Sequence, residues 1–473
     1  MELCDLTLLE AHQGLKTKKF SSRELVLSCL KRIDEVEDDL NAFITVTAED
    51  ALKKADEVDK AIASGREISP LAGIPVAIKD IFCTKGIETT AASNILLGFI
   101  PPYDATVVKK LKAQNVVIIG KTNCDAFAHG SSGENSDFGP TKNPWDLTRV
   151  PGGSSSGSAA ATASGESIFA ICTDTGGSTR LPAGFCSLVG LKPTYGRVSR
   201  YGVIAMASSL DSPGPIAKTV SDCALVAEIM TGHDPLDSTT PTVPVPNYHE
   251  SLKRNIKGLK IGVPQEYFTE GIEPEVEELV REAIAKLEEM GAWAVEISLP
   301  HTRYGVATYA LICHSEVSSN LARYDGIRFG HQRENFGDEA KRRIMLGTFA
   351  LSSGYYDQYY QKAQKVRTLI KRDFNEAFKK VDVIITPTYP GVPFKLGEKV
   401  NDPLKMYLSD IFMVPVNLAG IPALNLPCGF SRRLPVGMQI IGPQFSEELL
   451  FRVGYTYEQA TEWHKRKPSL NFQ

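Results

Sequence analysis

Three short segments, each with a lysine or serine that could take part in catalysis, constrain the fold of this chain most strongly. Lys79 ends the apolar run Ile74-Pro-Val-Ala-Ile-Lys79, Ser154 lies within Gly152-Gly-Ser-Ser-Ser-Gly-Ser158, and Ser178 ends Asp174-Thr-Gly-Gly-Ser178. The glycines tolerate positive φ and a close approach of the backbone, so the last segment is typical of a tight turn after a strand. In α/β sheets, sites are built in loops beyond the carboxyl ends of strands. We therefore expect an α/β fold in which Lys79 lies at such a strand end.

Helical and strand patterns alternate along the chain. Ser21-Ser-Arg-Glu24 forms a capping box that predicts a helix start, and 51–64 reads as a charged helix, so a helical region is expected over about 1–65. A β-α-β pattern follows at 74–78, 106–113 and 116–119. Further strands are expected at 167–172, 259–263, 294–297, 381–385, 423–427 and 436–441, and long helices at 274–290 and 355–380. Four prolines predict a surface excursion near 234–247.

Composition excludes several classes of protein. With 473 residues, 42% hydrophobic and 23% charged, the chain can bury a large core and is neither fibrous nor disordered. A formal net charge of −4 lacks the basic excess of a chain that binds nucleic acid by itself. The nine cysteines include no Cys-x-x-Cys pair, so neither a disulfide framework nor a zinc ribbon is predicted.

Targeting and metal signals are also missing from the sequence. The segment Met1 to Leu6 has no basic and apolar signal regions, and no apolar run approaches the roughly 20 residues of a membrane span. The eight histidines show no paired metal-binding spacing. We expect a cytoplasmic protein that contacts no membrane and binds no metal.

Two other motif matches fail in their context. Gly153-Ser-Ser-Ser-Gly157 fits the nucleophile elbow of α/β-hydrolases, but no buried strand precedes it. Gly120-Lys-Thr122 is similar to the end of a phosphate loop, yet Asn115 stands where the first glycine is required. Because the residues between form an apolar strand pattern, ATP binding is not expected here.

A serine hydroxyl attacks near neutral pH only when a base removes its proton. Lys79 can be that base if burial lowers its pKa by roughly three units from about 10.4. The N–H groups from Thr175 through Ser178 can converge on one oxygen as an oxyanion hole. Purely structural interpretations remain open on these residues alone: a surface lysine, a Gly/Ser linker and an ordinary tight turn.

The order and spacing of Lys79, Ser154 and Ser178 resemble the amidase signature family and its Ser-cisSer-Lys triad. More narrowly, five further segments resemble the A subunits of glutamyl-tRNA(Gln) amidotransferases: 190–200, 208–211, 318–326, 341–347 and 415–420. The resemblance covers nearly the whole chain. It implies a single domain over 1–473 with the amidase signature fold, a large mixed β-sheet sandwiched by α-helices.

The resemblance also implies a role for each site residue. Ser178 is the nucleophile, Ser154 is the cis-peptide serine that relays its proton, and Lys79 is the general base. Arg343 binds the α-carboxylate of glutamine and Asp410 binds its α-ammonium. The remaining predicted residues are the oxyanion-hole segment Thr175, Gly176, Gly177 and Ser178, and the pocket residues Ser131 and Tyr309.

Partners follow from the same resemblance. The chain is expected in a heterotrimer with the B and C subunits, where ammonia from glutamine converts Glu-tRNA(Gln), or Asp-tRNA(Asn), to the amidated form. The B subunit is expected to hold most of the tRNA and also ATP and Mg²⁺, which leaves no cofactor in this chain. The alternatives are a free-standing amidase for another small amide and a non-catalytic assembly subunit. The residues that depart from the family pattern near the triad are Ala126, His129, Ser156, Thr179 and Leu181.

Overall fold

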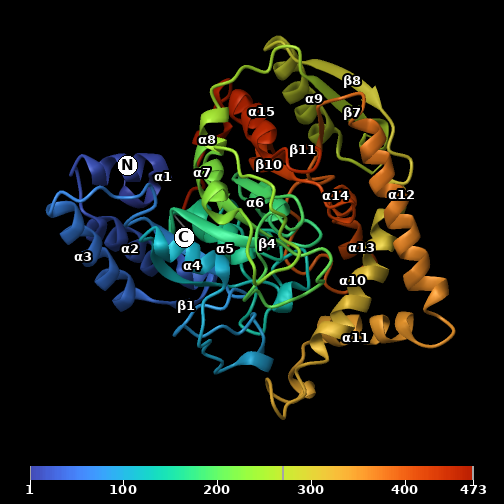
Figure 1. Cartoon of the computed structure of the whole chain (residues 1–473), viewed down its shortest axis with the longest axis horizontal. Helices are drawn as coiled ribbons and strands as arrows, with labels where there is room; N and C mark the ends of the chain where they lie inside the picture. The colour runs from blue at the N-terminus through green and yellow to red at the C-terminus, as the bar shows by residue number, and fades with distance from the viewer. Residues whose placement is uncertain (1, 269–270, 471–473) are drawn as a thin grey trace.

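The computed structural model describes residues 2–268 and 271–470, so residues 1, 269–270 and 471–473 of the predicted domain lie outside the described part. One mixed sheet of eleven strands runs through the described residues in the order β1-β3-β2-β4-β6-β5-β10-β11-β9-β7-β8 (Figure 1). The strands are β1 Phe43–Val46, β2 Pro75–Lys79, β3 Val117–Thr122, β4 Phe169–Asp174, β5 Val189–Lys192, β6 Ser212–Ala217, β7 Lys260–Pro264, β8 Trp293–Ile297, β9 Val383–Pro387, β10 Ala423–Ser431 and β11 Leu434–Ile441.

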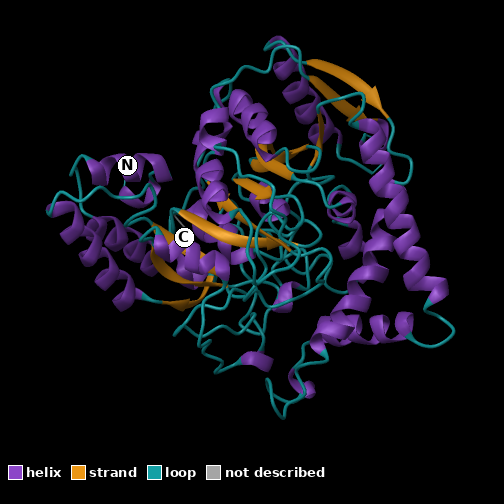
Figure 2. Ribbon diagram, viewed as in Figure 1, coloured by secondary structure: helices purple, strands orange, loops and turns teal. Residues whose placement is uncertain are grey.

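Helices surround this sheet, as Figure 2 shows. The helices are α1 Leu8–Lys16, α2 Ser22–Leu40, α3 Ala48–Ala63, α4 Thr106–Ala113, α5 Ser156–Ser164, α6 Arg180–Phe185, α7 Val220–Met230, α8 Tyr248–Ser251, α9 Pro274–Glu289, α10 Gly305–Leu321, α11 Asp338–Leu351, α12 Lys362–Ala377, α13 Pro403–Leu408, α14 Val414–Ala419 and α15 Glu447–Gln459. In Figure 1, α1 to α3 lie at one end of the view and α10 to α12 at the other. The predicted α/β fold with a helix-covered mixed sheet is confirmed.

Strands β1, β5 and β6 were not predicted from the sequence, and each of these omissions has a physical reason. Strands β1 and β5 are only four residues long. Strand β6 contains Pro213 and Pro215, which cannot donate ladder hydrogen bonds, yet it pairs with β4 along its whole length. The helix expected over 355–380 begins with a π-helical turn at Asp357–Gln361 and continues as α12.

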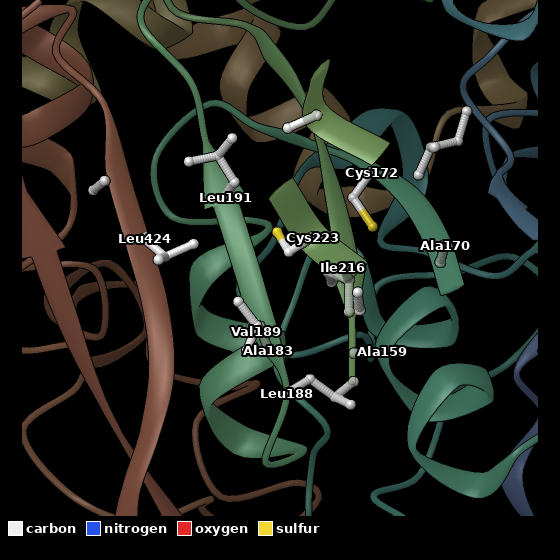
Figure 3. Packing of buried hydrophobic residues seen from close by; sticks show 14 of the residues in the cluster. Ala159, Ala170, Cys172, Ala183, Leu188, Val189, Leu191, Ile216, Cys223 and Leu424 are labelled. Atoms are coloured by element: carbon white, nitrogen blue, oxygen red, sulfur yellow. The ribbon is translucent and has the colours of Figure 1, made fainter. Parts of the chain in front are cut away.

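Small and branched apolar side chains fill the core between the central strands and their helices. Figure 3 shows Ala170 and Cys172 of β4 near Ile216 of β6, with Ala159 of α5 and Cys223 of α7 beside them. Burial of aliphatic side chains stabilises the fold by about 1.5–3 kcal/mol each. The short side chains of α5 let that helix pack closely against β2 and β4. This packing fixes the carboxyl ends of two neighbouring parallel strands, where the site is found.

Other features of the chain bear on its chemistry. All nine cysteines lie buried as free thiols within the described residues. Segment 234–247 runs between α7 and α8 without helix or strand, and Arg197 donates to the carbonyl oxygens of Val243 and Pro244 at 2.9 and 2.8 Å. In the described part of the chain, none of the helices combines the length and the apolar character needed to cross a membrane.

Candidate active site

Lys79 lies at the carboxyl end of β2, beside the parallel strand β4. Its side chain is 0% exposed. The Nζ atom donates to Ser154 Oγ at 2.7 Å, Ser155 Oγ at 2.9 Å and Thr173 Oγ1 at 3.2 Å. Burial lowers the pKa of the Lys79 amine, because a charged ammonium loses its hydration there. The interpretation of Lys79 as an exposed surface charge is therefore wrong.

The Gly-Ser turn brings Ser154 and Ser155 to this amine. The Gly153–Ser154 peptide bond is cis, and α5 begins at Ser156. The Ser155 N–H donates to the carbonyl oxygen of Ser178 at 3.3 Å, which ties the two serine turns together. Because α5 follows at once and every residue of the turn is buried, the flexible-linker interpretation is also wrong. Sequence reasoning missed the contact between Ser155 and Lys79 and placed Ser155 only within the Gly-Ser segment.

Ser178 lies in the loop between β4 and α6, and the carboxylate of Asp174 holds that loop. Asp174 Oδ1 accepts from the Gly177 N–H at 2.9 Å, and Oδ2 accepts from the N–H groups of Thr179 and Arg180, both at 3.3 Å. Gly177 has φ +133°, a left-handed conformation that favours glycine. Ser178 itself is 7% exposed.

A fully buried ion pair neutralises Asp174. The Arg180 guanidinium donates from Nε to Oδ2 and from Nη2 to Oδ1, both at 3.0 Å. It also donates to Gln439 Oε1 at 2.7 Å and to Asn417 Oδ1 at 2.6 Å. Burial alone would raise the pKa of Asp174, but the Arg180 charge lowers it to about 2. Sequence reasoning missed this pair, although Asp and Arg flank the Gly-Gly-Ser segment.

The loop from Thr175 to Ser178 presents backbone donors to the site. The Gly177 N–H is already bonded to Asp174. The N–H groups of Thr175, Gly176 and Ser178 have no acceptor among the described residues. Thr175 Oγ1 donates to the buried carboxylate of Asp211 at 2.7 Å, which fixes the start of the loop. The donors left for an oxyanion are therefore three of the four predicted ones.

The residues predicted for the amino-acid end of a substrate lie on a second group of elements. Asp410 follows α13 and accepts from Ser131 Oγ at 2.7 Å, and burial raises the pKa of Asp410 to about 7. Tyr309 on α10 packs over the Ser178 loop, because a Cβ placed on Gly176 would lie 2.7 Å from the Tyr309 hydroxyl. Tyr309 is thus brought to the Ser178 loop, and Ser131 and Asp410 are brought to each other.

Arg343 projects from α11 and is 5% exposed. Its Nε donates to Glu339 Oε1 at 2.7 Å, and the Tyr407 hydroxyl donates to the same oxygen at 3.2 Å. The two terminal nitrogens of the Arg343 guanidinium have no hydrogen-bond partner among the described residues. The positive charge of Arg343 acts on the Asp410 carboxyl and opposes the rise in its pKa. The fork is therefore free to take a second anion near Asp410.

The five departures from the family pattern are all buried around the site. Both ring nitrogens of His129 lack a partner among the described residues, and burial lowers the pKa of His129 well below its ordinary value. Ser156 Oγ donates to Thr141 Oγ1 at 3.3 Å, whereas the Thr179 hydroxyl is unpartnered in the described structure. Leu181 packs in a small apolar cluster, and Ala126 is 4% exposed.

Clustered metal ligands are not found in the described part of the chain. No group of three or more His, Cys, Asp or Glu side chains within residues 2–268 and 271–470 is arranged to hold an ion. Lys121, of the segment similar to a phosphate loop, is buried in β3 and pairs with Asp80 Oδ1 at 3.0 Å. That lysine is committed to an internal carboxylate and does not face a phosphate site.

Comparisons with known proteins agree with this geometry. A family model described as Amidase matches residues 24–451. The A subunit of glutamyl-tRNA(Gln) amidotransferase from Moorella thermoacetica is 57% identical over 99% of each chain. The crystal structure of the Thermotoga maritima protein of the same name has a TM-score of 0.84 and 44% identity, covering 98% of this chain and 96% of that one. The structure of 6-aminohexanoate cyclic dimer hydrolase has a TM-score of 0.88 and 25% identity over 99% of each chain. The chain therefore belongs to the amidase family and, within it, to the family of glutamyl-tRNA(Gln) amidotransferase A subunits.

Proposed function

We propose that this chain is the glutaminase subunit of a tRNA-dependent amidotransferase. It hydrolyses the side-chain amide of glutamine and supplies the ammonia with which the complex converts Glu-tRNA(Gln) to Gln-tRNA(Gln). The observation that carries the proposal is the buried Lys79 amine, 2.7 Å from Ser154 Oγ, in a turn bonded to the Ser178 loop. A lysine in this environment is a base and not a surface charge.

The reaction begins with attack of Ser178 Oγ on the amide carbon of glutamine. The hydroxyl proton passes to Ser154 Oγ as the Ser154 proton passes to Lys79 Nζ, which burial favours in its neutral form. The N–H groups of Thr175, Gly176 and Ser178 stabilise the resulting oxyanion. The proton then returns through Ser154 to the leaving nitrogen, the C–N bond breaks, and ammonia departs. Water hydrolyses the glutamyl ester on Ser178 by the same proton route and releases glutamate.

Substrate choice rests on the charged ends of the amino acid. The terminal nitrogens of Arg343 match the two oxygens of an α-carboxylate, because a guanidinium fork binds carboxylates in a bidentate manner. Asp410 faces the α-ammonium, with Ser131 beside it. An ammonium at hydrogen-bond distance lowers the pKa of Asp410 from about 7, so substrate binding itself favours the ionised carboxylate. Tyr309 packs against Gly176 beside these groups.

The product is ammonia, so the proposal requires an acceptor elsewhere. We assign the acceptor to the B subunit of a cytoplasmic heterotrimer whose third chain is the C subunit. The B subunit would hold most of the tRNA, together with ATP and Mg²⁺ for activation of the glutamyl carboxylate. The internal pairing of Lys121 with Asp80 supports placing the nucleotide outside this chain. The relative that is named as an A subunit, matched over 99% of both chains, supports the assembly.

A free-standing amidase for another small amide is the second candidate. The likeness to 6-aminohexanoate cyclic dimer hydrolase favours it, because that fold carries a different amide substrate. The buried Arg343 and Asp410 argue for a zwitterionic amino acid instead. A substitution at Arg343 therefore separates the two candidates.

Ammonia release tests the proposal with glutamine and with asparagine, in the presence and absence of the B and C subunits. Ser178→Ala is expected to lower kcat by several orders of magnitude. Arg343→Ala should raise the KM for glutamine by about 100-fold, the scale of a lost charge-assisted interaction. Arg342→Ala is the matched control, since Arg342 pairs with the same Glu339 but is 41% exposed.

Each contrary outcome has a distinct meaning. A complete complex with intact Ser178 that releases no ammonia from glutamine would overturn the proposal. An unchanged KM in Arg343→Ala would indicate another amide substrate. Full glutamine-dependent amidation by Ser178→Ala would leave the chain a non-catalytic assembly subunit.

A further inference from the structure

Asp125 is a buried carboxylate that the proposed reaction does not use. It lies in the segment that follows β3 and precedes Ser131, and its side chain is 0% exposed. A carboxylate without water must have its oxygens satisfied by donors inside the protein. Both donors to the Asp125 carboxylate belong to the loop that carries Ser131, and the turn that carries Ser154 packs against the same residue.

The carboxylate closes the Ser131 loop from within. Asp125 Oδ1 accepts from the N–H groups of Gly133 at 3.1 Å and Asn135 at 3.0 Å, and Oδ2 accepts from Gly133 at 3.0 Å. Ser131, which donates to Asp410, lies inside the loop that these bonds close. Displacement of the carboxylate would therefore move the hydroxyl that contacts Asp410.

The same residue also contacts the turn of the relay serine. The Asp125 N–H donates to the carbonyl oxygen of Ser154 at 3.2 Å. A Cβ placed on Gly153 would overlap Asp125 Oδ2, and a Cβ on Gly130 would overlap Oδ1. The backbones that precede Ser154 and Ser131 thus both lie directly against one carboxyl group, with no room for a larger group.

We infer that Asp125 is a positioning residue that couples the substrate-binding loop to the proton relay: one carboxylate sets the places of both Ser131 and Ser154. The inference rests on the proposed function for the roles of those two serines. Burial raises the pKa of Asp125 to about 6, while its N–H donors favour the ionised form. An amide at this position would place an NH₂ group against backbone N–H groups or against Gly153. Both serines would then shift together.

Two measurements on the purified complex separate the two serines. The rate at which a fluorophosphonate labels Ser178, followed by intact mass, reports the proton relay without any amino-acid substrate. The KM for glutamine in ammonia release reports the Ser131 side. Asp125→Asn is expected to slow labelling and to raise the KM, each by about 10- to 100-fold. Ser131→Ala should raise the KM alone.

Asp137→Asn is the matched control. It is the same substitution two residues beyond Asn135, but Asp137 is exposed and accepts from Ser93 Oγ and the Asn94 N–H instead. It should leave both the labelling rate and the KM unchanged. Gly130→Ala is a second variant that pushes on the carboxylate from the Ser131 side, and it should reproduce both effects of Asp125→Asn. It decides the question if Asp125→Asn does not fold.

The inference is overturned if Asp125→Asn and Gly130→Ala change only one of the two quantities in folded protein. It is also overturned if both variants lower thermal stability while the labelling rate and the KM of the folded molecules stay at wild-type values. That result would indicate a merely structural residue. Failure of the wild type to label at Ser178, or to release ammonia, would instead contradict the proposed function.

Discussion

Replacement of Asp174 by Asn tests whether the buried ion pair holds the nucleophile loop. The substitution keeps the shape of the side chain and removes its charge. Asp174 accepts hydrogen bonds from Gly177, Thr179, Asn417 and Arg180, and all of these partners are donors. Whichever way an Asn side chain turns, its NH₂ group faces N–H groups. The Arg180 guanidinium is left with an uncompensated buried charge.

The expected cost follows from that geometry. Asp174 and Arg180 are both 0% exposed, so water cannot replace the lost partner. Removal of one member of a buried pair costs about 3–5 kcal/mol. We therefore expect Asp174→Asn to lower the free energy of unfolding by this amount. Ammonia release should fall as well, because either the Gly177 or the Thr179 N–H group, each of which shapes the Ser178 loop, loses its acceptor.

Urea unfolding followed by circular dichroism measures the change. Glu277→Gln is the control, since the Glu277–Arg281 pair is a 2.8 Å contact between side chains that are 30% and 52% exposed, and such a solvated pair is worth less than about 1 kcal/mol. Adding Arg180→Met to Asp174→Asn removes the unpaired buried charge. The double variant should therefore lose about 2 kcal/mol less free energy of unfolding than the sum of the losses in the two single variants. An Asp174→Asn variant that loses no more stability than Glu277→Gln would refute the reasoning.

Two further predictions concern Lys79 and His129, two side chains whose pKa values are lowered by burial. The kcat/KM for glutamine should rise with pH as Lys79 loses its proton, because the neutral amine is the proposed base. Burial lowers the pKa of Lys79, so the pH at which kcat/KM rises should lie below the ordinary lysine value of 10.5. A rise centred at or above pH 10.5 would contradict this role of Lys79. His129→Leu should raise the free energy of unfolding by about 1 kcal/mol in a urea titration, because it removes two unpartnered buried nitrogens; a clear loss of stability would show that the imidazole has a partner.

Much of the candidate site can be predicted from short sequence patterns. The strand that ends at Lys79 and the two glycine-serine turns are contiguous segments, and their conformations follow from residues a few positions apart. The structure places their polar groups together because β2 and β4 are adjacent parallel strands. Each segment can be predicted from its own residues, but the adjacency of β2 and β4 is known only from the strand order of the sheet.

The parts that sequence reasoning missed depend on burial across long separations. Asp174 and Arg180 look like loop charges until Gln439 and Asn417, more than two hundred residues away, are placed around them. Gly177 is equivalent to its neighbours as an oxyanion donor until Asp174 takes its N–H. Strand β6 is hidden by Pro213 and Pro215, because their missing N–H groups violate the usual strand pattern.

The nine buried thiols make the redox state of the surroundings matter only when the chain opens. In the folded protein each thiol is shielded, and burial raises the pKa of Cys172 to about 11, so reactive thiolate is scarce. Unfolding would expose all nine at once on a chain whose native state uses no disulfide among the described residues. Any disulfide formed then would be non-native and would trap the open chain. The same core that protects these sulfur atoms therefore makes recovery from unfolding dependent on a reductant.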